Sequence, residues 1–118
     1  MNRGSRRWAI ATVALVLLSA ASINLYALAG AGRKQTFTGE VGDAMCGRKH
    51  MDGPAAECTR SCVAHGSRFA LVVGEKIYIL DTSDAAALGM LDKQAGKTAT
   101  VTGVLNGDTI AVSAVAPN

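Results

Sequence analysis

Thiol and imidazole side chains gather in one short stretch of this sequence. All three cysteines and both histidines of the 118-residue chain lie between residues 43 and 66, in DAMCGRKHMDGPAAECTRSCVAHG. Thiolates and imidazoles together are typical ligands of tetrahedral zinc, and thiolates with nearby thioethers suit copper(I). The stretch therefore predicts a copper or zinc site, whose candidate ligands are Cys46, His50, Cys58, Cys62 and His65.

A short helix brings three of these ligands onto one face. Segment 54–65 begins with a proline, which suits the first turn of a helix, and a glycine suited to the end of a helix follows it. In such a helix three candidate ligands stand at i, i+4 and i+7, stacked turn upon turn: Cys58, Cys62 and His65. The loop before the helix supplies Cys46 and His50.

The first 29 residues have the pattern of an export signal or an N-terminal membrane anchor. Three arginines precede an apolar run over residues 8–29, and Ala27-Leu28-Ala29 offers a cleavage site that makes Gly30 the mature start. An uncleaved anchor is the alternative, because about 20 apolar residues can span a bilayer. Under either interpretation we expect residues 30–118 in the periplasm or anchored to the outer face of the inner membrane, with membrane contact only through residues 8–29.

The charge of the exported part argues against a nucleic-acid partner. The chain carries a net charge of +3, but the three arginines of the first eight residues account for all of it. From Gly30 onward, basic and acidic residues balance. A nucleic-acid binder needs a basic face to neutralise phosphates, and none is visible in this sequence.

Residues 30–118 predict one small, mainly β domain. Alternating apolar and polar residues indicate five strands, over residues 36–41, 68–73, 76–80, 98–105 and 109–115. Two hairpin turns are expected, a type II′ turn at Gly74-Glu75 and another turn at Asn106-Gly107. A helix capped by Ser83-Asp84 and ended by Gly96 separates the third and fourth strands. This connectivity predicts a five-stranded OB-like barrel with residues 43–66 inserted between strands 1 and 2. An open α+β sheet is the competing fold.

The sequence also resembles a family of small exported bacterial proteins. The motifs that carry the resemblance are Asp43-x-x-Cys46 with His50-Met51, Cys58-Thr59-x-x-Cys62-Val63, Gly66-x-x-x-Ala70-Leu71-Val72, Ile77-Tyr78-x-Leu80, Gly96-Lys97-x-x-x-Val101-Thr102-Gly103 and Gly107-x-Thr109-Ile110-x-Val112. The function of that family is unknown and its fold is presumed to be OB-like. The resemblance therefore implies export and an OB-like fold, and implies no activity.

A disulfide is the alternative to a metal. Cysteines of exported proteins usually pair, and a bridge from Cys46 to Cys58 or Cys62 pins the loop to the helix. A bridge between Cys58 and Cys62 has poor geometry inside a regular helix. Closing a loop of about 15 residues contributes about 3 kcal/mol in the chain-entropy model. One thiol is then left over. A redox role, the third interpretation, requires an accessible thiolate of low pKa.

Sharper catalytic and cofactor motifs are missing. Haem attachment needs Cys-x-x-Cys-His, but three residues separate Cys58 from Cys62. Asp43 and Asp52 flank the cysteine loop, where we expect them to be solvated, and no motif places a catalytic triad. We therefore predict a non-enzymatic exported domain that binds copper or zinc. The alternative is a disulfide-stapled structural or interaction module, such as an accessory subunit that docks on an unknown protein of a membrane or periplasmic complex.

Overall fold

The computed structural model describes residues 32–50 and 53–118. The predicted signal or anchor, with its cleavage site at Ala27–Ala29, lies outside the described residues, as do Met51 and Asp52 of the cysteine loop. Residues 33–118 form one unit. Within the described part of the chain, neither helix combines the length and the hydropathy needed to cross a membrane.

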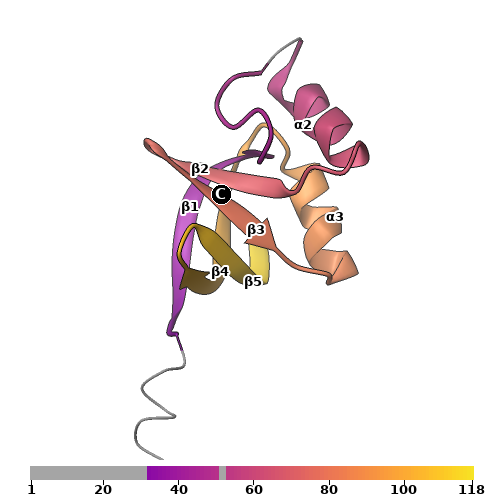
Figure 1. The fold of residues 1–118 in the computed structure, drawn as a ribbon. Helices are drawn as coiled ribbons and strands as arrows, with labels where there is room; N and C mark the ends of the chain where they lie inside the picture. The colour runs from indigo at the N-terminus through magenta and orange to yellow at the C-terminus, as the bar shows by residue number, and fades with distance from the viewer. Residues whose placement is uncertain (1–31, 51–52) are drawn as a thin grey trace, which may run out of the picture. The chain divides into compact units, whose positions relative to one another are not determined.

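Five strands and two helices follow one another in the predicted order (Figure 1). The strands are β1 (Lys34–Asp43), β2 (Phe69–Val73), β3 (Lys76–Asp81), β4 (Thr98–Asn106) and β5 (Thr109–Pro117). Helix α2 (Ala55–Ala64) lies between β1 and β2, and helix α3 (Ala85–Lys93) lies between β3 and β4. The mainly β class and both predicted helices are therefore confirmed, with bounds that differ by one or two residues from those expected.

The five-stranded sheet closes on itself in the order β1-β2-β3-β5-β4. Strand β1 completes the ring because its first part, Lys34–Glu40, pairs with β4 and its last part, Glu40–Asp43, pairs with β2. The β3–β5 pair is parallel and the other four pairs are antiparallel. A closed ring leaves no open sheet edge. The competing prediction of an open α+β sheet is therefore wrong.

The hydrophobic core draws on every strand of the ring. Its buried members are Val41, Phe69, Leu71, Leu80, Leu91, Ala99, Val101 and Ile110. Leu91 comes from α3, and the partly buried Val63 of α2 packs against the same cluster. Alternation along β4, where Ala99 and Val101 are buried, is the period of two expected for a strand with one face inward. Both helices are thus anchored to one core.

The last hairpin turns one residue later than predicted. We expected Asn106-Gly107 as the turn, but Asn106 pairs with Thr109, so the two loop residues are Gly107 and Asp108. Gly107 has φ +61, and no described residue other than glycine has a positive φ. One positive φ at the first loop position fits type II′, whereas type I′ requires two. The position of the single glycine therefore decides where the chain turns.

Candidate metal centre

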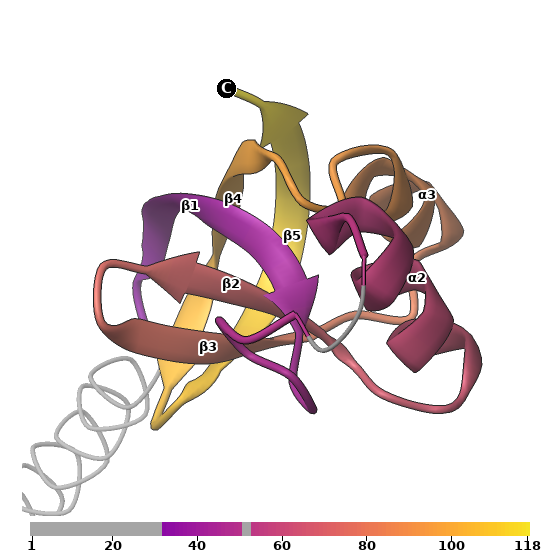
Figure 2. The same ribbon diagram turned by 90° about the horizontal axis from the view of Figure 1, so that it is seen from above.

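The loop that follows β1 faces helix α2, as both ribbon views show (Figures 1 and 2). Backbone hydrogen bonds fix the start of this loop: Ala44 N donates to Arg68 O at 2.9 Å and Gly47 N donates to Asp43 O at 3.0 Å. The carboxylate of Asp43 accepts the N–H of Cys46, with 2.8 Å between Cys46 N and Asp43 Oδ2. Cys46 is therefore held by the end of a strand that belongs to the ring.

Gly47 allows this turn to lie against the sheet. Its φ is +58, a conformation that side chains rarely adopt, and a Cβ built on it would lie 2.7 Å from Cδ1 of Ile77 in β3. Any larger residue at this position strains the backbone, and the terminal methyl of Ile77 must move to make room for it. Glycine after Cys46 thus keeps the cysteine loop close to the ring.

Helix α2 is oriented by contacts on its other faces. Thr59 is fully buried, and Val63 packs against the core. Arg60 connects α2 to α3: its Nη2 donates to the carbonyl oxygen of Asp92 at 2.8 Å, and its Nε lies 3.4 Å from Asp92 Oδ1. These contacts leave Cys58 and Cys62 on the side of α2 that faces the loop.

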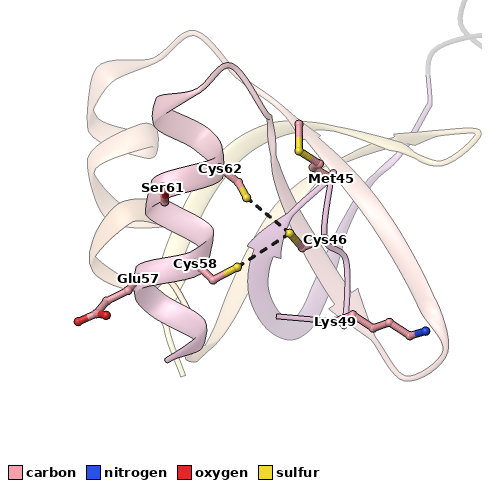
Figure 3. Close-up of a pocket in the computed structure, with 7 residues that line it drawn as sticks. All are labelled: Met45, Cys46, Lys49, Glu57, Cys58, Ser61 and Cys62. Atoms are coloured by element: carbon pink, nitrogen blue, oxygen red, sulfur yellow. Dashed lines mark hydrogen bonds between the residues drawn. The ribbon is translucent and has the colours of Figure 1, made fainter. Parts of the chain in front are cut away.

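The three cysteine sulfurs point toward one another (Figure 3). Cys46 Sγ lies 3.5 Å from Cys62 Sγ and 3.9 Å from Cys58 Sγ, and all three atoms lie within 4.8 Å of one another. Three thiolates around a tetrahedral zinc, each about 2.3 Å from the ion, stand about 3.8 Å apart. The cluster therefore has the spacing of a set of metal ligands.

The predicted disulfide is not formed in this structure. A disulfide bond is about 2.05 Å long, and the closest pair of sulfurs, Cys46 and Cys62, is 3.5 Å apart. The distance places these two sulfurs in van der Waals or hydrogen-bond contact without a covalent bond. A bridge from Cys46 to Cys58 or Cys62, the alternative drawn from the sequence, is therefore absent from this structure.

The cluster opens into a pocket of about 550 Å³. Its lining residues are Met45, Cys46, Lys49, Glu57, Cys58, Ser61 and Cys62. The side chains of Lys49 and Glu57 extend away from the sulfurs (Figure 3), and Met45 is 70% exposed. The cysteines are only half-buried. An ion can therefore reach the sulfurs from solvent.

Two thiols of the cluster, those of Cys46 and Cys62, have raised pKa values. The hydrogen bond with Cys62, followed by desolvation, the hydrogen bond with Cys58 and the negative charge of Asp43, raises the pKa of Cys46 to about 12. The hydrogen bond with Cys46 lowers the pKa of Cys62, but desolvation and the charges of Asp43 and Cys58 outweigh it, so that this pKa is raised. Redox-active cysteines have lowered pKa values. These shifts argue against a redox centre and leave the protons to be displaced by a metal ion.

The two histidines lie outside the sulfur cluster. His65 caps the end of α2, with its Nδ1 2.7 Å from the carbonyl oxygen of Ser61. Nε2 of His50 lies 3.4 Å from Oε1 of Glu40 in β1. Within residues 32–50 and 53–118, the one group of three or more metal-ligating side chains consists of the cysteines. The structure thus brings together three of the five predicted ligands.

Asp43 is the residue at this site that the sequence did not reveal. We expected a solvated flanking acid, but Asp43 is 1% exposed and lies at the inner end of β1. Its Oδ2 accepts the Cys46 N–H, while its Oδ1 is buried without a hydrogen-bond partner. The available signal was the Asp-x-x-Cys spacing, which lets a side-chain carboxylate bond the backbone three residues on.

Comparisons of the chain with protein-family models, with curated proteins and with solved structures find no match.

Proposed function

We propose that this protein binds a thiophilic metal ion, copper or zinc, through Cys46, Cys58 and Cys62, and that it is not an enzyme. The observation that carries the proposal is the spacing of the sulfurs, 3.5 and 3.9 Å from Cys46 to the other two. Two separate elements, a loop and a helix, bring these thiols to one point. Thiolates at this spacing can share one ion at ordinary bond lengths for zinc, and copper(I) favours the same soft ligands.

The placement of the cluster favours an ion that is stored, sensed or passed on. The buried core draws its members from the five strands and α3, and none of the three cysteines belongs to it. The ion is therefore not needed to complete the core. Half-buried sulfurs, an open pocket and the exposed thioether of Met45 suit a site that exchanges its ion with solvent or a partner.

The fold and the location belong to the same proposal. The strand order β1-β2-β3-β5-β4, the parallel β3–β5 pair and a helix between β3 and β4 support an OB-like fold. The arginines and the apolar run of the first 29 residues, together with the family resemblance, support export. The ion is then bound outside the cytoplasm.

A disulfide-stapled interaction module is the second candidate, and the closeness of one cysteine pair favours it. Cys46 Sγ and Cys62 Sγ are 3.5 Å apart, so a small rotation of the side chains brings them to bonding distance under oxidising conditions. That bond ties the β1 loop to α2 and removes two of the three metal ligands. The two candidates therefore exclude each other in any one molecule.

A native mass of the whole protein, produced in an exporting bacterial host with its own N-terminal segment, separates the candidates. We expect one copper or zinc ion per chain in the wild type and none in Cys58→Ser or Cys62→Ser. Ser61→Ala is the matched control, because Ser61 lines the same pocket on the same helix without a soft ligand atom. A metal-free mass about two units light in the wild type indicates a disulfide and refutes the metal proposal.

A further inference from the structure

Asp43 presents an unsatisfied carboxylate oxygen beside the sulfur cluster. The side chain is 1% exposed, its Oδ2 accepts the N–H of Cys46 at 2.8 Å, and its Oδ1 is buried without a hydrogen-bond partner. Buried polar atoms of folded proteins are almost always paired, and an unpaired carboxylate oxygen destabilises the fold. A cation bound at the cluster would give this oxygen a partner.

A short turn places the Asp43 carboxylate next to the backbone of Cys46. Asp43 and Cys46 are three residues apart, and the hydrogen bond from Cys46 N to Oδ2 closes the turn between them. The turn therefore keeps the buried carboxylate beside the backbone of Cys46, the cysteine whose sulfur contacts both sulfurs of α2.

We propose that Asp43 is the fourth ligand of the metal and that the site consequently takes zinc in preference to copper(I). This inference rests on the function proposed above. Zinc in proteins is most often four-coordinate and accepts aspartate oxygen together with thiolates. Copper(I) is a softer ion that selects thiolate and thioether ligands, so a carboxylate oxygen adds little to its binding. A Cys3Asp set is therefore complete for zinc, whereas copper(I) uses only the three sulfurs.

The test measures zinc and copper(I) affinities of the full chain, reduced, metal-free and purified in mild detergent, by competition with chromophoric chelators. We expect Asp43→Asn to weaken zinc binding by at least about 100-fold, the upper range for loss of an outer-shell partner. Its copper(I) affinity should change by less than about 10-fold. Glu57→Gln is the matched control, because Glu57 lines the same pocket but extends away from the sulfurs (Figure 3), and it should leave both affinities unchanged.

Asp43→Cys is a second variant. Its expected effect does not follow if the role of Asp43 is merely structural. It replaces the carboxylate by a thiolate and should restore the zinc affinity lost in Asp43→Asn, because four cysteines also form a zinc site. Equal losses of zinc and copper(I) in Asp43→Asn, or equal losses in Asp43→Asn and Glu57→Gln, overturn the inference, because the carboxylate then acts only through charge or folding.

If the Asp43 variants do not fold, X-ray absorption of the zinc-loaded wild type decides whether Asp43 is a zinc ligand. Three sulfurs at about 2.3 Å and one oxygen at about 2.0–2.2 Å that persists when imidazole is added support Asp43 as ligand. An oxygen that imidazole displaces belongs to water and overturns the inference. Wild-type protein that binds neither ion with all thiols reduced refutes the proposed function itself, whereas wild-type zinc affinity in Asp43→Asn refutes only the role of Asp43.

Discussion

Cys46 is the centre of the sulfur cluster, because it contacts both cysteines of α2. Its Sγ lies 3.5 Å from Cys62 and 3.9 Å from Cys58, and it is the one cysteine that comes from the β1 loop. Without it, two thiols remain four residues apart on one helix face. Two thiols alone would leave the other coordination positions of a zinc or copper ion to water, so the proposed site needs all three sulfurs.

Cys46→Ser should lower zinc and copper(I) affinity by at least about 100-fold, because a serine hydroxyl is a poor ligand for soft ions. His65→Ala should leave both affinities unchanged, since the His65 ring bonds the Ser61 carbonyl at the end of α2. Competition titrations of the reduced proteins measure the zinc and copper(I) affinities of both variants. A large loss of affinity in His65→Ala would contradict a ligand set that contains no histidine.

The pKa of Cys46 predicts how the stability of the reduced, metal-free protein depends on pH. This pKa is raised to about 12 in the folded state, whereas a cysteine of an unfolded chain titrates near about 8.5. The folded state binds the proton more tightly, so the stabilising contribution is fully present below about pH 8.5 and is lost as pH rises toward 12. The urea midpoint should therefore fall between about pH 8.5 and 10.5.

Cys46→Ser is the control for that measurement, because it removes the titrating group while the rest of the chain keeps its charges. Its urea midpoint should change less over the same pH range. A wild-type midpoint that rises with pH, or a decline of equal steepness in both proteins, would show that another group controls the stability.

Helix α2 carries two of the proposed ligands, Cys58 and Cys62, on one face and contacts the rest of the domain through other residues. Thr59 is fully buried, and its Oγ1 has no hydrogen-bond partner. Val63 reaches the core and Arg60 bonds α3 through Asp92. The helix is thus positioned by contacts that do not involve its cysteines, and its stability can be changed without altering the proposed ligands.

Thr59→Val should raise the free energy of unfolding by about 1 kcal/mol, because it removes an unsatisfied buried hydroxyl and keeps nearly the same shape. Valine and threonine have similar helix propensities, so the helix itself changes little. Urea unfolding of the metal-free protein measures the effect, with metal affinity as the control that should not change. A less stable Thr59→Val protein would show that the hydroxyl does find a partner.

The ring of strands and the cysteine cluster are separate parts of one folded unit. The core lies in the ring and includes Leu91 of α3, whereas the three cysteines lie in the β1 loop and α2. The N-terminal part of β1 pairs with β4 and its C-terminal part pairs with β2, so the strand that closes the ring ends at Asp43 and leads into the loop that carries Cys46. Metal binding should therefore add stability to a protein that folds without it.

Zinc at about 100 times its dissociation constant should raise the free energy of unfolding by about 2.7 kcal/mol, and a chelator should remove that increment and leave a cooperative transition. Thermal unfolding with and without zinc measures the difference. Cys62→Ser should show no zinc-dependent shift. Loss of the whole folding transition on chelation would mean that the ion is structural, contrary to the proposed exchange role.

The sequence by itself determined the features that depend on near neighbours. The alternation of apolar and polar residues marked the strands. Asp84 was identified as a helix cap, and the structure confirms this cap, because Ala87 N donates to Asp84 Oδ2 at 2.9 Å. The helical period alone placed Cys58 and Cys62 on one face. These are local properties, because side-chain periodicity and capping involve residues only a few positions apart.

Only the tertiary structure decided which groups join the two cysteines of α2. Pairing of Asp43 with Phe69 fixes both ends of the inserted segment, so that Cys46 meets α2, while His50 lies beside Glu40. The same pairing buries Asp43, which the sequence suggested was solvated. The Asp43–Phe69 pair joins residues far apart in the chain, and burial depends on what else covers a residue. Neither the spacing of residues nor their types can therefore predict which side chains gather at the cluster.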